Sequence, residues 1–365
     1  MGILSANDTR GPGGEEMFVR TLRDALITRG VSVRVIDRSQ AANTASASRW
    51  DSISRPVARF ARFEEIWQSY AVGREASQTR SSGELMVVNS HAGWWVPDLP
   101  GLTVYHGTRS GFGSAVQPRL SLSYAKSRYG IGPFEARSAG RRLVVAVSHS
   151  AADELLSLYG LVADAVLLNA VDIDQYHPRD RATVRRHLGL ESSGFLALFT
   201  GRPGRHKGTD LLTEISRGLP ADITIVAAVP RRYDAHPRTR QLVGLDHDRI
   251  AELYAACDAF VFPSRWEACS YSLVEALASG LPPVASRVGH MPEVCASDES
   301  LDAIAPANLE PAAFIRSLIS LRDRPDLRNS ASRAARRFAE SNHDAMRWAH
   351  AYISLLERAE SANRN

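Results

Sequence analysis

The stretch RWEACSYSLVEALASGLPPVAS, residues 265–286, places two glutamates, Glu267 and Glu275, beside the start of a short amphipathic helix. Gly280 ends this helix, and the apolar run that follows it has the composition of a buried strand. Ser272 and Glu275 have the spacing of a capping box, so Glu275 has a purely structural interpretation as a helix cap. Glu267 precedes the helix, after a strand-like run, where a parallel sheet presents residues to ligands. Two carboxylates near one helix start repel each other, and sugar hydroxyls would offer them hydrogen-bond donors.

The succession of strand and helix in this stretch recurs along the whole chain, which is typical of α/β units with parallel sheets. In the first half the sequence predicts strands at residues 2–7, 31–37, 85–90, 102–107, 142–148 and 165–173. In the second half it predicts strands at residues 195–202, 223–229, 259–264, 282–286 and 302–306. A chain of 365 residues can bury two cores. We therefore expect two Rossmann-like sheets in tandem, with a ligand cleft between two domains.

The loop TGRPGRHKGTD, residues 200–210, follows a predicted strand and runs into a helix. Its three glycines allow close approach of the backbone to a ligand, and Arg202, Arg205 and Lys207 add positive charge. Amide donors and the helix dipole at such a place favour phosphate, while the alternative is a solvated basic turn. Lysine occurs in this chain only at residues 126 and 207, which makes Lys207 the position to test.

Composition excludes several other classes of protein. The net charge is only +4 and there is no dense Lys/Arg tract, so we expect no nucleic-acid partner. The three cysteines lack a CxxC spacing and are expected to be buried thiols without a disulfide or a zinc site. No apolar run reaches the length of a membrane span and no signal peptide is evident, so a cytoplasmic location is expected.

One segment leaves two interpretations open. Residues 54–72 carry aromatic and apolar side chains at helical spacing with arginines between them. A helix that packs on the core is favoured, and the alternative is a basic amphipathic helix that lies on a membrane.

Several longer stretches together resemble the family 4 retaining glycosyltransferases of the GT-B fold. The resemblance is carried by GRPGRHKGTDLL (201–212), by the run from VGLDHD to MPEV (243–294), and by VSHSAADELLSLYG (147–160) with LLNAVDIDQYHP (167–178). The residues GPGGEEMFVRTLRDALITRGVSV (11–33) and VYHG (104–107) extend it to the N-terminal half.

The resemblance implies a fold and a division of the chain. Two Rossmann-like parallel-sheet domains would face a cleft, with residues 1–172 as the acceptor-binding domain and 173–344 as the nucleotide-sugar-binding domain. The C-terminal helix, about 345–365, would cross back to the N-terminal domain. Asn169 and Asp172 in NAVD would mark the passage between the domains.

The resemblance also implies roles for individual residues. Arg202 and Lys207 would hold the donor diphosphate, Glu275 the ribose hydroxyls, and Glu267 the transferred sugar. His106 would lie near the reacting sugar, although a histidine hydrogen-bonded at a strand end is an equal alternative for it. The catalytic set is then Arg202, Lys207, Glu267 and His106. The donor-binding set is Gly13, Gly14, Arg202, Lys207, Glu267, Cys269, Ser270, Tyr271 and Glu275, and the acceptor-binding residues are His91 and Arg109.

The chain departs from the family pattern after the first acid, where Ala268, Cys269 and Ser270 replace a common Gly-aromatic-Gly. The identity of the donor sugar stays open for that reason. The sequence predicts a metal-independent enzyme without a cofactor that transfers a sugar from a nucleoside diphosphate to a small natural-product or sugar-like acceptor. The alternatives are a lipid acceptor at a membrane surface, a nucleotide-sugar epimerase on the same fold, and a catalytically silent binding protein.

Overall fold

The computed structural model describes residues 1–11, 13–39, 64–190 and 194–364, and the chain divides into two compact units. Unit 1 consists of Met1–Leu168 together with Ala345–Asn365, and unit 2 of Asn169–Asp344. The sequence placed the boundary after residue 172, whereas the contacts divide the chain directly before Asn169.

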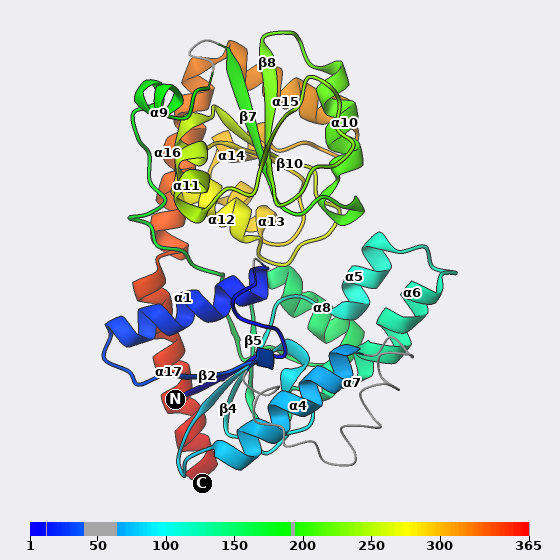
Figure 1. Ribbon diagram of the computed structural model, residues 1–365, viewed down its shortest axis with the longest axis vertical. Coiled ribbons are helices and arrows are strands. Elements are labelled where there is room, and N and C mark those ends of the chain that lie inside the picture. The colour runs from blue at the N-terminus through cyan, green and yellow to red at the C-terminus, as the bar shows by residue number, and fades with distance from the viewer. Residues whose placement is uncertain (12, 40–63, 191–193, 365) are drawn as a thin grey trace. The chain divides into compact units, whose positions relative to one another are not determined.

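Unit 1 is built on a parallel sheet whose strand order is β2-β1-β3-β4-β5-β6 (Figure 1). Its strands are β1 (Gly2–Leu4), β2 (Arg34–Ile36), β3 (Met86–Asn89), β4 (Gly101–Tyr105), β5 (Leu143–Ala146) and β6 (Ala165–Val166). Its helices are α1 (Gly14–Thr28), α4 (Glu64–Thr79), η1 (Ser90–Gly93), α5 (Arg109–Val116), α6 (Leu122–Ala125), η2 (Lys126–Ile131), α7 (Gly132–Arg137), α8 (His149–Tyr159) and α17 (Ala345–Arg364). The order of the strands in the sheet reverses between β1 and β3, so the loops after these two strands diverge at the sheet's carboxyl edge.

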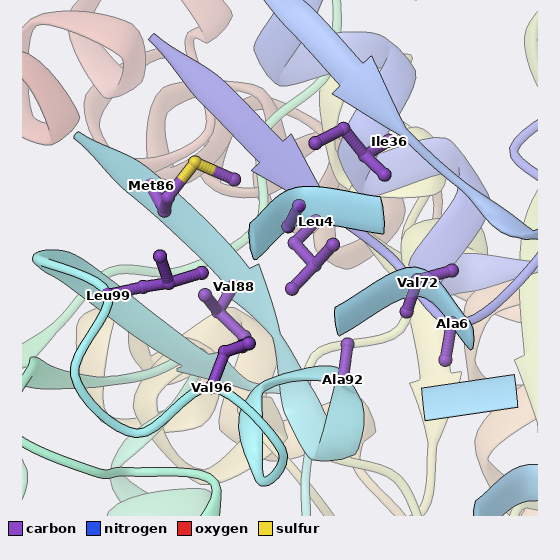
Figure 2. Close-up of a cluster of buried hydrophobic side chains, with 10 residues drawn as sticks. Leu4, Ala6, Ile36, Val72, Met86, Val88, Ala92, Val96 and Leu99 are labelled. Atoms are coloured by element: carbon purple, nitrogen blue, oxygen red, sulfur yellow. The ribbon is translucent and has the colours of Figure 1, made fainter. Parts of the chain in front are cut away.

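The two faces of this sheet bury different side chains because successive strand residues point to opposite sides. Leu4, Met86 and Val88 lie on one face, in a single hydrophobic cluster that includes Val72 of α4 (Figure 2). On the other side, the ring of Phe18 in α1 meets the rings of Trp348 and Tyr352 in α17 at centroid distances of 5.2 and 5.9 Å. The C-terminal helix therefore belongs to the N-terminal sheet, as the sequence predicted.

Unit 2 contains a parallel sheet with the order β11-β10-β7-β8-β9. Its strands are β7 (Phe195–Thr200), β8 (Ile223–Val229), β9 (Arg240–Val243), β10 (Ala259–Phe262) and β11 (Pro283–Ala285). Its helices are α9 (Arg181–His187), η3 (Arg205–Lys207), α10 (Thr209–Gly218), α11 (His247–Ala256), α12 (Tyr271–Ala278), α13 (Met291–Ser297), α14 (Glu299–Ile304), α15 (Pro311–Asp323) and α16 (Pro325–Asn342). The strand order reverses between β7 and β10, which is the position where open α/β sheets bind ligands.

Two predictions of secondary structure were wrong. The strand expected at 302–306 is largely helical, because α14 continues to Ile304 after Asp298 caps its start. Strand β9 was missed, since Arg240–Val243 lies at the sheet edge and has a mixed polar and apolar composition rather than a buried β-branched run.

The expectation that the three cysteines are buried thiols is confirmed. Cys257, Cys269 and Cys295 are buried free thiols. No helix in the described ranges is long and apolar enough to cross a membrane. In the segment 54–72, residues 54–63 lie outside the described residues, while Val72 in α4 is fully buried in the core.

Candidate active site

The candidate site in unit 2 is formed by two loops that leave neighbouring strands at the point where the strand order reverses. Residues 201–208 follow β7, and residues 263–270 follow β10. Gly208 joins the two loops, since its φ is +67° and a Cβ there would lie 1.9 Å from the carbonyl oxygen of Pro263. Only glycine combines that backbone conformation with so close an approach.

Lys207 and Glu267 meet at this junction. Their Nζ and Oε1 atoms are 2.8 Å apart, and the side chains are only 16% and 12% exposed. The ammonium group of Lys207 also lies over the ring of Phe262, 5.2 Å from its centroid. The structure thus brings together the residues that the sequence assigned to the diphosphate and to the transferred sugar.

Arg265 holds the two loops against each other, and sequence reasoning missed it. Its guanidinium donates to both carboxylate oxygens of Asp210 at 2.7 Å, and also to the carbonyl of Arg205 at 2.7 Å. Its backbone N–H donates to the carbonyl of His206 at 2.8 Å. Arg265 thus ties the two peptides that precede Lys207 to Asp210, which follows it. Asp210 in the first turn of α10 was the available signal, because an acid at a basic anion-binding loop calls for a partner.

Arg202 stands apart from this arrangement. Its side chain is exposed, and it makes no hydrogen bond or ion pair within the described part of the chain. The geometry therefore leaves Arg202 available to a ligand but does not aim it.

Glu275 is buried in α12, where its Oε2 accepts a hydrogen bond of 2.8 Å from the hydroxyl of Tyr254. Burial raises the pKa of Glu275 to about 7, although hydrogen bonds from the hydroxyls of Tyr254 and Tyr176 and the charge of Lys207 oppose that rise. The Tyr254 hydroxyl in turn contacts the hydroxyl of Thr200 at 2.6 Å.

The predicted capping box is wrong. The helix begins at Tyr271 with Ser270 as its N-cap, so Glu275 falls one turn inside and points to Tyr254 instead of to the helix start. Ser270 contacts Ser272 through their hydroxyls at 2.9 Å. A structural role as a helix cap is therefore excluded for Glu275, and its buried carboxylate needs another explanation.

The remaining donor-binding candidates of unit 2 follow Glu267 directly. Cys269 and Tyr271 are buried. The backbone N–H and side-chain amide of Asn169 donate to the sulfur and the carbonyl of Cys269, at 3.3 and 2.7 Å. Burial raises the pKa of the Cys269 thiol well above its usual value, so this thiol is a packing and hydrogen-bonding group rather than a nucleophile.

In unit 1, the glycine turn has a different character. Gly13 is the N-cap of α1, and Glu15 and Glu16 occupy the first turn of that helix. Glu15 accepts a 2.7 Å hydrogen bond from the side chain of Asn7. Burial raises the pKa of Glu15 to about 7, against the opposing charge of Arg109. Gly14 is exposed at the first position of the helix.

His106 directly follows the last residue of β4. Its Nε2 is 2.5 Å from the Oδ1 of Asn89, and its ring packs edge-on against Phe18 with centroids 4.6 Å apart. Burial lowers the pKa of His106 to about 3. The hydrogen-bonded strand-end position that the sequence left open for His106 is therefore present in the structure.

His91 and Arg109 lie near each other at the same edge of the sheet. His91 in η1 is buried, and burial followed by the charge of Arg109 lowers its pKa to about 3. Its Nε2 has no hydrogen-bond partner among the described residues. Arg109 forms a 3.3 Å ion pair with Glu65, and its backbone N–H donates to Glu135 at 2.7 Å.

Within the described ranges, no three His, Cys, Asp or Glu side chains come together in a way that could hold a metal ion. The charged groups at the junction of the two loops are instead Lys207, Glu267, Arg265 and Asp210.

Known structures share this architecture across both units. Sucrose-phosphate synthase of Thermosynechococcus elongatus is similar with a TM-score of 0.79 at 18% identity, over 99% of this chain and 98% of that one. Anabaena HepE in complex with UDP-glucose is similar with a TM-score of 0.68 at 17% identity, over 98% and 99%. Two parallel-sheet, Rossmann-like units of this kind define the GT-B fold of glycosyltransferases.

Sequence comparison then gives the family. The model for "Glycosyltransferase Family 4" matches residues 12–175, and the model for "Glycosyl transferases group 1" matches residues 232–338. A D-inositol 3-phosphate glycosyltransferase of Catenulispora acidiphila is 29% identical over 79% of this chain and 75% of its own length. One from Saccharomonospora viridis is 25% identical over 92% and 87%. The chain belongs to the family 4 glycosyltransferases.

Proposed function

We propose that this protein transfers a sugar from a nucleoside diphosphate donor to a hydroxyl of a small, sugar-like acceptor, with retention of the anomeric configuration. The observation that carries the proposal is the 2.8 Å contact between Lys207 and Glu267 at the strand-order reversal of unit 2. The bond that breaks in such a donor joins a phosphate to a sugar. The ammonium group of Lys207 suits the phosphate, and the carboxylate of Glu267 suits the hydroxyls of the sugar.

The roles of the residues follow from charge and burial. Lys207 would neutralise the charge that develops on the leaving diphosphate, and the exposed Arg202 of the same loop would add a second cation. Glu267 would accept hydrogen bonds from the hydroxyls of the sugar. Glu275, which already accepts a hydrogen bond from the hydroxyl of Tyr254, would accept hydrogen bonds from the hydroxyls of the ribose. The sugar–phosphate bond breaks while a bond to the acceptor oxygen forms on the same face. The acceptor proton passes to the departing phosphate oxygen, so no enzymic nucleophile is required.

The acceptor is expected to be a polyol. The relatives named above are D-inositol 3-phosphate glycosyltransferases. In unit 1, the carboxylate of Glu15 and the unpartnered Nε2 of His91 are groups that hydroxyls can meet. His106 would contact the transferred sugar through its neutral ring.

The purified protein should be screened against UDP-, GDP- and dTDP-sugars, with inositol, inositol phosphates and simple sugars as acceptors. We expect nucleotide release that depends on the acceptor, a product that keeps the donor's anomeric configuration by NMR, and activity that persists in excess EDTA. Lys207→Ala serves as the control for contaminating activity.

Each part of the proposal can fail separately. Conversion of the donor sugar to its epimer without any acceptor would favour a nucleotide-sugar epimerase. A strict need for added magnesium would contradict metal independence. A product with inverted configuration would contradict retention, and binding of donors without turnover of any acceptor in the panel would contradict the proposed acceptor class.

A further inference from the structure

We propose that the tip formed by residues 118–129 of unit 1, called here the α5–α6 tip, docks on an anionic lipid surface. This inference is independent of the reaction that the protein catalyses. Leu120, Leu122 and Tyr129 are 103%, 84% and 72% exposed. Three of the four most exposed large apolar side chains among the described residues therefore lie within ten positions of each other.

Local structure explains why these side chains face outward. Pro118 follows Gln117, the C-cap of α5, and the hydroxyl of Ser121 caps α6 by accepting the N–H of Tyr124 at 3.1 Å. Helix α6 is a single turn with no buried residue. In Figure 1, α5 and α6 lie side by side and the turn between them projects beyond both. The tip is thus a defined turn and not a frayed end.

The tip is also anchored at its base. Ser127 and Ile131 of the π-helical turn η2 are buried, and the rings of Tyr124 and Tyr129 meet edge-on at 6.5 Å. The apolar side chains on the outside therefore project from a supported platform. Single exposed leucines are common on protein surfaces. Several exposed apolar side chains on one ordered, projecting turn indicate a surface that binds a membrane or another molecule.

Charge identifies what covers it. The tip carries Arg119, Lys126 and Arg128, and no aspartate or glutamate occurs between residues 110 and 134. Two copies of this chain that met at their tips would bring six cations together, which disfavours self-association. Anionic headgroups complement the cations, leucines enter the acyl boundary, and tyrosine prefers the headgroup level.

Another exposed apolar residue shows what an ordinary surface position is like. Val162, which is 73% exposed, lies two residues from Asp164, and no Lys, Arg or His occurs within ten positions of it on either side. It combines exposure with negative charge, so it supplies a matched control.

The test is co-sedimentation of the full-length protein with vesicles of phosphatidylcholine alone or mixed with phosphatidylglycerol, at low and high salt. We expect binding to the anionic vesicles, weakened strongly by salt. The double variant Arg119→Gln/Arg128→Gln should lose on the order of tenfold or more, given the contribution of each cation near an anionic surface. Leu120→Ser/Leu122→Ser should lose about tenfold through reduced insertion.

Val162→Ser and Arg141→Gln, which alter exposed residues of unit 1 outside the tip, should bind like the unmodified protein. Melting temperatures and turnover with a soluble acceptor should be unchanged in the tip variants, which shows that they fold. The proposal is wrong if the unmodified protein ignores anionic vesicles or if the tip variants bind as well as it does. It is also wrong if ultracentrifugation shows an oligomer that the tip variants convert to monomer, because the tip would then join copies of the chain.

Discussion

Helices α1 and α10 begin at corresponding places in the two units, each after the first strand of its sheet and each with a glycine as N-cap. Their first turns differ in charge. The turn of α1 carries Glu15 and Glu16, with Glu15 buried enough to raise its pKa to about 7. The turn of α10 carries Asp210, which Arg265 neutralises by a bidentate pair, and it is preceded by Lys207.

Under the proposed function, this difference would assign the donor and the acceptor to different units. A helix start attracts anions through its free N–H groups, but two carboxylates in the first turn cancel that attraction. The start of α10 keeps it and adds an ammonium group held by Glu267. The same supersecondary unit therefore suits a diphosphate in unit 2 and the neutral hydroxyls of an acceptor in unit 1.

The largest effect is expected at Lys207. Lys207→Ala should reduce turnover by about 10²–10³-fold, because a pre-aimed charge that stabilises the leaving diphosphate is lost. Steady-state kinetics measure it, and Arg205→Ala is the matched control, since its exposed side chain should contribute less than about threefold. Equal losses in the two variants would mean that the total positive charge of the loop stabilises the diphosphate, and that Lys207 has no specific role.

A smaller effect should separate the two acids of unit 2. Glu275→Gln should weaken both the free nucleotide diphosphate and the intact donor, since both carry the ribose. Glu267→Gln should leave nucleotide binding nearly unchanged and lower turnover. One charge-assisted hydrogen bond implies on the order of tenfold or more in each case. Calorimetry with the nucleotide and with the donor distinguishes them, and equal loss of nucleotide affinity in both variants would overturn the assignment.

The smallest effect concerns the stability of unit 1. The pKa of Glu15 rises from 4.5 to about 7 on folding, so the folded protein holds this proton more tightly than the unfolded chain does. The protonated Glu15 therefore stabilises the folded protein fully below pH 4.5, and this stabilisation is lost as the pH rises to about 7. Glu15→Gln should raise the melting temperature by a few degrees above that pH and leave it unchanged below 4.5. Glu16→Gln in the same turn is the control. An equal rise in melting temperature there would mean that negative charge anywhere in the first turn of α1 destabilises the protein, and not the burial of Glu15.

The sequence predicted what depends on local composition. Buried β-branched runs gave ten of the eleven strands, and glycines with cations located the loop after β7. It failed where tertiary contacts decide. Residues 302–306 have a strand-like composition but follow the Asp298 cap, and Glu275 has capping-box spacing but turns toward Tyr254, which lies 21 positions away. Arg265 meets Asp210 across 55 positions, and no local pattern pairs them.

The close approach of Gly208 to Pro263 limits how the two loops can change, both in engineered variants and during evolution of the family. Because a methyl group at 208 would collide with the Pro263 backbone, and Arg265 is bonded to the loop that Gly208 ends, residues 201–210 and 263–267 form one exchangeable module. A chimera that takes residues 201–210 from one relative and residues 263–267 from another would misplace Lys207 even if each loop were intact. Donor preference should therefore pass between relatives only when both loops are grafted together.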